Sequence, residues 1–314
     1  MSVWTGRVDV PESVPARRWH QVVQAWDGQR DLAGALTILG FRCDEGVRRN
    51  AGRVGAVDGP AAIRRALAGL AYSRPGAVFD AGDVSCDDAD LEAAQDCLAG
   101  QVEAVLKHGG LPLVFGGGHE VAWGGFCGAA RYLQATAPSR RLGIVNFDAH
   151  FDLRDPVPVP NSGTPFRQVA QWCTQQGRPF HYAVIGISPA ANTAALFETA
   201  RDCGVLWFED MDCRVAAVER ALEGFLRNID DLYLTVCLDV FPAAVAPGVS
   251  APAALGVEPA VVMALLRRLG VRCREQGVVL RLVDIAEMNP RYDPGGRTAA
   301  LAARLVHEIT TVWG

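Results

Sequence analysis

Two acidic clusters in this chain each follow a short apolar run: Asp148-Ala-His150-Phe-Asp152 and Cys237-Leu-Asp239. Successive side chains of a strand point to opposite faces, so residues two apart project to the same side. Each cluster should therefore aim carboxylate, imidazole or thiol groups into one shared volume. We expect a metal site built at the ends of strands.

A third group of potential ligands comes from the glycine run Gly116-Gly117-Gly118, which ends the apolar segment 111–115 and precedes His119. Glycine permits a tight turn and close backbone approach, which would deliver this imidazole into the same volume. Imidazole and carboxylate ligands suit cations such as Mn²⁺, and a carboxylate can bridge two of them. The pattern predicts a dinuclear hydrolytic centre. Its expected ligands are His119, Asp148, His150, Asp152, Cys237 and Asp239.

Each of these residues also has a structural interpretation. A single aspartate at a strand end is often a helix cap, and a single histidine is often a packing group. The convergence of several such residues favours a site over coincidence. Covalent catalysis is a rival chemistry, but Ser162 and Ser250 lack the strand-elbow sequence of a hydrolase nucleophile. No covalent intermediate is expected.

Three segments resemble the metal-binding motifs of the ureohydrolase (arginase) family: 116–120, 146–152, and 237–239 followed by Ala246-Pro-Gly248. The similarity extends from about Leu36 to Pro290 and so covers most of the chain. Flanking sequences resemble one branch of the family, the one that acts on N-formimino-L-glutamate. Those flanks are the start of the chain around Trp4 and Trp19, the segment 41–50, Arg53 with Gly59-Pro60, and the segment 161–166.

The resemblance implies hydrolysis of N-formimino-L-glutamate to L-glutamate and formamide, by attack of metal-bound hydroxide on the formimino carbon. It implies two Mn²⁺ ions per chain, with Asp148 bridging them. Cys237 departs from the family pattern, which has a bridging aspartate there. A thiolate could bind weakly, favour zinc or iron, or leave one ion loosely held, and the thiol could also be an inert buried group.

The resemblance also suggests catalytic and substrate-binding residues. Asp239 would accept or redirect a proton, and Glu287 would hold the formimino NH groups. Arg154 suits a carboxylate of an anionic substrate, although it could simply pair with Asp155. Arg48, Arg49 and Arg53 are alternatives for the second carboxylate. Asn161, Ser162 and Thr164 are further candidates for substrate binding.

Arginase-like enzymes carry a proton-shuttling histidine at a position that Phe166 occupies in this chain. No shuttle residue can be named from the sequence. Two other functions therefore stay open. One is hydrolysis of another amidine or guanidine, as by an agmatinase or a guanidino-acid hydrolase. The other is a metal-poor, non-catalytic relative, which the thiol at 237 and the missing histidine both suggest.

Composition limits the remaining possibilities. The chain has 314 residues, half of them hydrophobic, and a net charge of −5 without a basic stripe, so nucleic-acid binding is not expected. Its nine cysteines include no CxxC pair. The polar start of the chain and the absence of a membrane-length apolar run indicate a cytoplasmic protein that is not bound to membranes. Family members are commonly oligomeric, and we expect a homo-oligomer.

Apolar runs that alternate with helical stretches predict a parallel sheet covered by helices on both faces. The expected strands are 36–41, 111–115, 142–147, 182–187, 204–208, 232–237 and 278–283. The expected helices are 60–70, 89–108, 215–227, 259–276 and 297–312. A barrel would show the same alternation, but the resemblance implies an open three-layer α/β/α sandwich. We expect an N-terminal extension, residues 1–34, packed on a single domain formed by residues 35–314.

Overall fold

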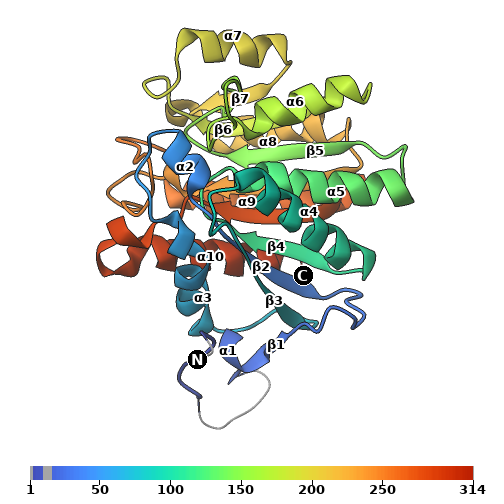
Figure 1. Ribbon diagram of the computed structural model, residues 1–314, viewed down its shortest axis with the longest axis vertical. Coiled ribbons are helices and arrows are strands. Elements are labelled where there is room, and N and C mark those ends of the chain that lie inside the picture. Colours follow the sequence, from blue (N-terminus) through green and yellow to red (C-terminus); the bar gives the residue numbers. More distant parts are fainter. Residues whose placement is uncertain (1–2, 10–15, 314) are drawn as a thin grey trace.

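The computed structural model of this protein describes residues 3–9 and 16–313. In this part of the chain a parallel sheet of nine strands runs through the middle of the molecule, in the order β1-β3-β2-β4-β9-β8-β5-β6-β7 (Figure 1). The strands are β1 (Val23–Ala25), β2 (Leu36–Arg42), β3 (Val78–Ser85), β4 (Leu111–Phe115), β5 (Leu142–Phe147), β6 (His181–Ile187), β7 (Leu206–Glu209), β8 (Asp231–Cys237) and β9 (Val279–Ala286).

Helices cover both faces of the sheet, and each face has its own hydrophobic core. One core contains side chains of α3 (Gly59–Ala68), α8 (Val215–Leu226), α9 (Pro259–Gln276) and α10 (Arg297–Val312). The other contains side chains of α4 (Leu91–Lys107), α5 (Val121–Thr136), α6 (Pro165–Gln175) and α7 (Ala194–Asp202). Short helices are α1 (Trp19–Val22) and α2 (Glu45–Arg49), and 3₁₀ turns span Ala56–Asp58, Asp210–Asp212, Leu238–Val240, Pro290–Tyr292 and Pro294–Gly296.

The apolar strands are buried on both sides, as a covered parallel sheet requires. Ile144 and Val145 are adjacent in β5, yet they belong to the two different cores. The sheet has two edges, β1 and β7, so it is open and does not close into a barrel. The predicted three-layer α/β/α fold with a parallel sheet is confirmed.

The N-terminal segment contributes to the sheet, which corrects our expectation that the first strand begins after residue 34. Strand β1 pairs with β3, and the indole of Trp4 donates a hydrogen bond to Asp80 (2.7 Å). Trp19 is fully buried in the core on the α3 side. The proposed boundary between residues 34 and 35 stays a prediction, and positions 1–2 and 10–15 of that extension lie outside the described residues.

Strand register places the predicted site at one edge of the sheet. In the centre of the sheet β4 pairs with β9, β9 with β8, and β8 with β5. Phe115 lies opposite Ile285, Phe147 opposite Val236, and Cys237 opposite Ala286. The residues that follow these strand ends therefore meet at the carboxyl edge, where open parallel sheets bind their ligands.

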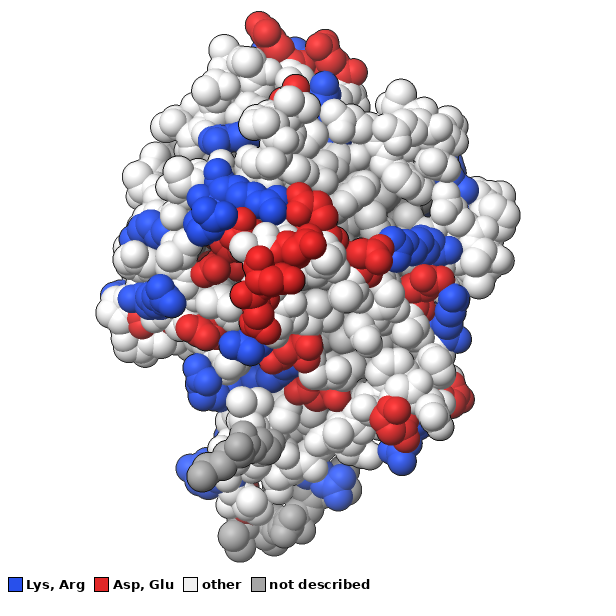
Figure 2. Space-filling model, viewed as in Figure 1, with Lys and Arg blue, Asp and Glu red and all other residues white. Residues whose placement is uncertain are grey.

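Basic and acidic side chains lie intermingled on the face seen in Figure 2, and the basic ones form no continuous stripe there. No helix within residues 3–9 and 16–313 combines the length and apolarity that a membrane span needs.

A buried carboxylate at the amino end of β8 should contribute strongly to stability. Asp231 is fully buried and accepts hydrogen bonds from Arg140 (Nη2, 2.9 Å) and from Arg281. Replacing it by alanine leaves two partly buried guanidinium groups without their partner. We expect Asp231→Ala to lower the free energy of unfolding by roughly 3 kcal/mol, measured by urea denaturation.

The adjacent Asp230 provides the control, because it pairs with Arg141 at the surface and both side chains are more than a third exposed. Asp230→Ala should cost less than about 1 kcal/mol. Equal losses for the two variants would contradict the role assigned to Asp231.

Candidate metal centre

A cavity of about 320 Å³ opens at the carboxyl edge of the sheet. Most of the residues that we predicted from the sequence line it: His119, His150, Asp152, Arg154, Ser162, Cys237, Asp239 and Glu287. Asp148 is completely buried beside them. The structure thus brings the whole predicted ligand set together around one cavity.

The ligand atoms form two groups that share one carboxylate. Donor atoms of His119, Asp148 and Cys237 lie within 4.8 Å of one another, and so do those of Asp148, His150 and Asp239. Asp152 adjoins the first group, with Oδ2 2.9 Å from Nδ1 of His119. Because Asp148 belongs to both groups, it is positioned to bridge two cations.

The hydrogen bonds of His119 show that this donor set fits a cation. Thr235 donates its hydroxyl proton to Asp284 (2.7 Å), so its oxygen accepts from Nε2–H of His119 (3.0 Å). Burial lowers the pKa of His119, but Asp148 and Asp152, each with an oxygen 2.9 Å from Nδ1, raise it overall. In the neutral imidazole, Nδ1 presents its lone pair to these two carboxylates. A cation between these atoms turns a repulsive contact into coordination, and the Thr235 contact is the outer support typical of ligating histidines.

Burial and negative charge dominate the electrostatics of the cavity. Burial, together with the charge of Asp148, raises the pKa of Asp152 to about 6. Burial, followed by the nearby carboxylates, likewise raises the pKa of the Cys237 thiol well above its usual range. For the His150 imidazole, burial lowers the pKa, but Asp239 and Asp148 outweigh it and raise the pKa overall. This concentration of buried acidic groups attracts divalent cations.

Cys237 is the unusual member of the ligand set. It ends β8, it is almost completely buried, and its sulfur lies within the His119 and Asp148 group. An inert core thiol would be surrounded by apolar side chains, whereas this one faces the carboxylates of Asp148, Asp239 and Glu287. The position favours a ligand role, with a softer donor than Mn²⁺ prefers.

Glu287 also lines this cavity. Its backbone has a φ of 68°, and its Oε1 accepts a hydrogen bond from the amide of His119 (2.9 Å). The other oxygen is buried without a hydrogen-bond partner among the described residues. Burial, with the charges of Glu120 and Asp239, raises the pKa of Glu287 to about 8. The side chain is placed to accept hydrogen bonds from a ligand.

Other predicted residues have structural contacts instead. Asn161 and Thr164 do not line the cavity. The Thr164 hydroxyl donates to the Asn161 carbonyl (2.9 Å), and the Asn161 side chain accepts from the Gly163 amide (2.9 Å), so both residues shape the turn before α6. Phe166 is fully buried and packs edge-on against the His119 ring at 5.4 Å between ring centroids. It excludes water there and cannot transfer a proton.

The alternative arginines are committed to other partners. Arg48 and Arg49 both pair with Glu45. Arg53 donates from its guanidinium to the carbonyls of Ser250 (3.1 Å) and Val249 and lies over the Tyr292 ring, so it anchors the loop that lines the cavity. Arg154 has no carboxylate partner among the described residues. The proposed surface pair with Asp155 is absent from that part of the chain, where Asp155 accepts from the Val157 amide instead.

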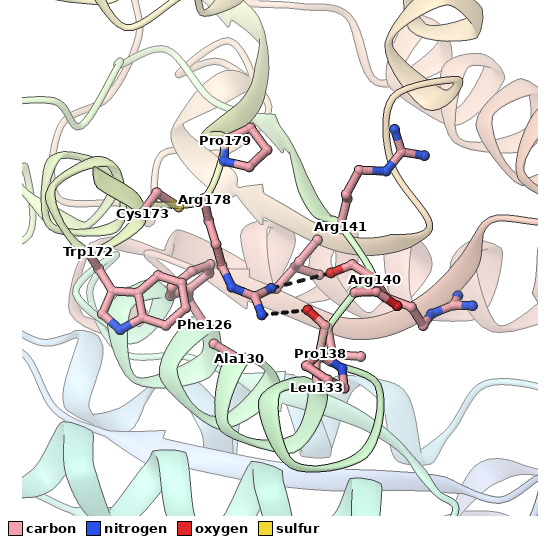
Figure 3. A pocket seen from close by; sticks show the side chains of 12 residues that line it. Phe126, Ala130, Leu133, Pro138, Arg140, Arg141, Trp172, Cys173, Arg178 and Pro179 are labelled. Atoms are coloured by element: carbon pink, nitrogen blue, oxygen red, sulfur yellow. Dashed lines mark hydrogen bonds between the residues drawn. The ribbon is translucent and has the colours of Figure 1, made fainter. Parts of the chain in front are cut away.

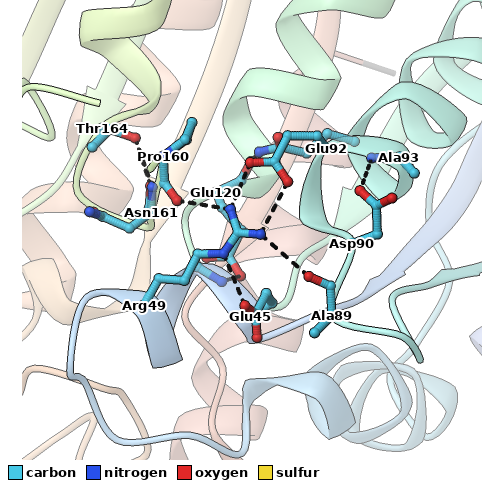
Figure 4. A network of polar contacts seen from close by, with 12 residues as sticks. Glu45, Arg49, Ala89, Asp90, Glu92, Ala93, Glu120, Pro160, Asn161 and Thr164 are labelled. Atoms are coloured by element: carbon cyan, nitrogen blue, oxygen red, sulfur yellow. Dashed lines mark hydrogen bonds and ion pairs between the residues drawn. The ribbon is translucent and has the colours of Figure 1, made fainter. Parts of the chain in front are cut away.

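Arg49 is the centre of a polar network that fixes one wall of the cavity (Figure 4). Its guanidinium donates to Glu45, to Glu92 (2.7 Å) and to the carbonyl of Pro160 (3.2 Å). These contacts connect α2 to the start of α4 and to the loop that carries Ser162. The network holds the loop in place and leaves no charge free for a ligand.

Two asparagines in the cavity wall were not predicted. Asn192 accepts from the Phe151 amide (3.1 Å) and donates to the Ala149 carbonyl (2.9 Å), so it supports the backbone of the metal motif. Asn50 contacts Arg154 and Ser162. Their partners lie tens of residues away in the chain, so no local spacing could have identified either residue.

A second cavity, of about 250 Å³, lies near the amino end of β5 and contains none of the predicted site residues. Its wall combines Phe126, Leu133 and Trp172 with arginines, and Arg178 donates to the carbonyls of Pro138 (2.7 Å) and Arg140 (3.4 Å) (Figure 3). The chemistry indicated by the sequence therefore belongs to the cavity at the carboxyl edge.

Comparison with known proteins agrees with the fold and the site. Residues 35–311 match the arginase family, and the chain belongs to that family. A formimidoylglutamase from Ralstonia nicotianae is 50% identical over 313 residues, covering 98% of this chain and 94% of the relative. One from Aeromonas salmonicida is 48% identical, covering 99% and 97%.

Solved structures give the same picture. A Trypanosoma cruzi formiminoglutamase with Mn²⁺ superimposes with a TM-score of 0.77 at 27% identity, covering 91% of this chain and 95% of that chain. A formimidoylglutamase from Bacillus subtilis has a TM-score of 0.82 at 20% identity, covering 94% and 91%. The second similarity supports the fold alone.

Proposed function

We propose that this protein hydrolyses N-formimino-L-glutamate to L-glutamate and formamide. The observation that carries the proposal is a single cavity in which two cation-binding groups share Asp148 and an arginine without an acidic partner stands in the wall. Full-length relatives near 50% identity bear the name formimidoylglutamase. Two bound cations together with a guanidinium in the wall would suit an amidine that also carries carboxylates.

The cofactor that we propose is Mn²⁺, two ions per chain, in keeping with the T. cruzi formiminoglutamase structure, which contains Mn²⁺. His119, Asp148, Asp152 and Cys237 would hold one ion, and Asp148, His150 and Asp239 the other. Bound there, the ions would lower the pKa of water toward neutrality and fix its position. We also propose that the protein is cytoplasmic and that it forms a homo-oligomer, the latter in keeping with the family resemblance.

Side chains of the cavity would orient the substrate and transfer the proton. The free oxygen of Glu287 would accept hydrogen bonds from the formimino NH groups and orient the reacting carbon. Asp239 would take the proton released as water adds to that carbon and pass it to the departing nitrogen of glutamate. Arg154 and Ser162 would hold a carboxylate of the substrate. Cleavage of the carbon–nitrogen bond then gives formamide and glutamate.

A variant of Arg154 tests whether the substrate is anionic. Arg154→Ala removes a charge-assisted hydrogen bond to a carboxylate, so KM for N-formimino-L-glutamate should rise roughly 10- to 100-fold with metal content unchanged. Steady-state glutamate release and metal analysis measure both quantities. Arg227→Ala is the control, because Arg227 pairs with Glu223 on the surface of α8.

The other two functions predict different results. A hydrolase for agmatine or a guanidino acid should prefer that substrate and tolerate Arg154→Ala. A non-catalytic relative, suggested by Cys237 and by Phe166 in place of the shuttle histidine, should hold little metal and release no glutamate with any divalent cation. Either result would reject the proposed function.

A further inference from the structure

Asn50 connects the two side chains that we assign to a substrate carboxylate. It caps the carboxyl end of α2, and its side-chain Oδ1 accepts a hydrogen bond from Nη1 of Arg154 (3.0 Å). Its Nδ2 donates to Oγ of Ser162 (3.1 Å). All three residues line the same cavity as the cation-binding groups. One neutral amide thus contacts both proposed carboxylate-binding groups.

The chemistry of these contacts fixes the direction of every hydrogen bond. A guanidinium can only donate, so the oxygen of the Asn50 amide must face Arg154 and the NH₂ group must face Ser162. The Ser162 oxygen therefore accepts, which leaves its hydroxyl proton free to donate elsewhere. Arg154 also keeps its positive charge, because the partner is neutral. Both groups are left as donors for a ligand in the cavity.

The surrounding backbone holds this arrangement rigidly. The Gly46 carbonyl accepts from the amides of both Asn50 (3.0 Å) and Ser162 (3.1 Å). The Arg154 amide donates to the Gly163 carbonyl (3.0 Å). A Cβ at residue 163 would lie 3.1 Å from Cδ of Arg154, so glycine leaves room for the arginine side chain. The donors are positioned before any ligand arrives.

We propose that Asn50 is a positioning residue that presents Arg154 and Ser162 as the paired donors of a carboxylate subsite and so sets the preference for an anionic substrate. This inference rests on the proposed function. The Asn50 amide accepts a hydrogen bond from the Arg154 guanidinium without neutralising its charge. It also donates to the Ser162 oxygen, so the Ser162 hydroxyl proton stays free to donate to a ligand.

The isosteric change Asn50→Asp should disable both donors at once. A carboxylate at this position accepts only, so it would form an ion pair with Arg154 and would accept a hydrogen bond from the Ser162 hydroxyl. The shape of the cavity wall stays the same. We expect KM for N-formimino-L-glutamate to rise on the order of 10- to 100-fold, with little change in kcat or in metal content.

The order of two variants separates positioning from mere structural support. Asn50→Ala removes both hydrogen bonds but leaves Arg154 charged and Ser162 able to donate, so KM should rise less than in Asn50→Asp. A purely structural role for Asn50 predicts the reverse order, because Asp preserves shape and Ala does not. In that case the proposal would be overturned. Asn228→Asp, just after α8, is the matched control, since that exposed side chain donates to the Gly224 carbonyl (3.2 Å).

A double variant tests whether Asn50 acts through the arginine. If it does, Asn50→Asp should weaken binding far less in an Arg154→Ala background than in the wild-type protein. Fully additive effects would contradict the proposal.

Substrates with one carboxylate provide a second test, using N-formimino-4-aminobutyrate and N-formimino-L-2-aminobutyrate. The rise in KM caused by Asn50→Asp should persist with one of these substrates and vanish with the other. An equal rise in KM with both substrates would overturn the subsite.

Failure of this inference can be distinguished from failure of the proposed function. Turnover of N-formimino-L-glutamate by the wild-type protein tests the function alone. Calorimetric binding of the product L-glutamate to wild type and Asn50→Asp tests the subsite without catalysis. If the wild-type protein shows no turnover but Asn50→Asp lowers the affinity for L-glutamate, the proposed function is rejected and the subsite is supported. If the wild-type protein is active but Asn50→Asp leaves the affinity for L-glutamate unchanged, the subsite is rejected.

Discussion

Replacing Asp148 by asparagine should abolish the dinuclear centre and reduce kcat/KM roughly 10³-fold or more. Asp148 is the one residue common to both ligand groups. Its two oxygens also accept hydrogen bonds from the Asn146 side chain (3.0 Å) and the His150 amide (2.7 Å). An amide has only one acceptor oxygen, so it can neither bridge two cations nor satisfy both of these donors.

The measurement is metal content per chain together with the rate of glutamate release, and thermal unfolding would show whether the variant is folded. Asp212→Asn serves as a control, because Asp212 lies in an exposed 3₁₀ turn far from the ligand groups in sequence. Retention of two tightly bound ions by a folded Asp148→Asn protein would contradict the bridging role.

Replacing Cys237 by aspartate should change the metal preference of the protein. The sulfur lies in the group formed with His119 and Asp148, where it supplies a soft donor to an otherwise nitrogen and oxygen set. An aspartate there would favour manganese over zinc. We expect the ratio of the two affinities to change at least roughly 100-fold, since even the loss of an outer-shell partner costs about 10- to 100-fold.

Competition between zinc and manganese for the chelator-stripped protein measures this ratio. With cobalt bound, the original protein should also show a sulfur-to-metal charge-transfer absorption that Cys237→Ser lacks. The exposed Cys97 provides the control Cys97→Ser, which should leave that absorption intact. An unchanged affinity ratio and no sulfur absorption would mean that Cys237 is a packing residue.

The strands that form the site were predictable because they are buried on both faces. The runs 111–115 and 142–147 match β4 and β5, since an almost unbroken apolar segment between turn residues has few other interpretations. Strand β3 was missed for the opposite reason: it contains Asp80, Gly82 and Asp83, and only its first two residues are buried. Its pairing with β2 is decided by tertiary contacts.

Helix α5 was missed because glycines weaken its local signal. Gly124, Gly125 and Gly128 disfavour a helix in isolation. Packing explains two of them: a Cβ at Gly128 would lie 2.6 Å from the Ala99 carbonyl oxygen and one at Gly124 would lie 2.9 Å from the Gln95 carbonyl oxygen, so these two glycines allow α4 and α5 to approach closely. Gly125 instead faces Leu282 of β9. The stabilisation from this packing of α4 against α5 exists only in the folded protein, so the local sequence does not reveal it.

The proposed metal ligands could be predicted for a geometric reason, since each ends or closely follows a strand whose register brings it to the same edge. The substrate side of the cavity was harder. Asn50, Asn192 and Ser250 reach it from loops, and their roles depend on partners far away in the chain. Asn161 and Thr164 carry the right chemical groups, but local turn hydrogen bonds use them.

The decisive measurement is glutamate release from N-formimino-L-glutamate by chelator-stripped protein that has been reloaded with manganese, zinc or iron and analysed for bound metal. We expect no turnover without metal and restored turnover with manganese at two ions per chain. Protein that binds two ions yet releases no glutamate, or that is fully active when stripped of metal, would contradict this expectation.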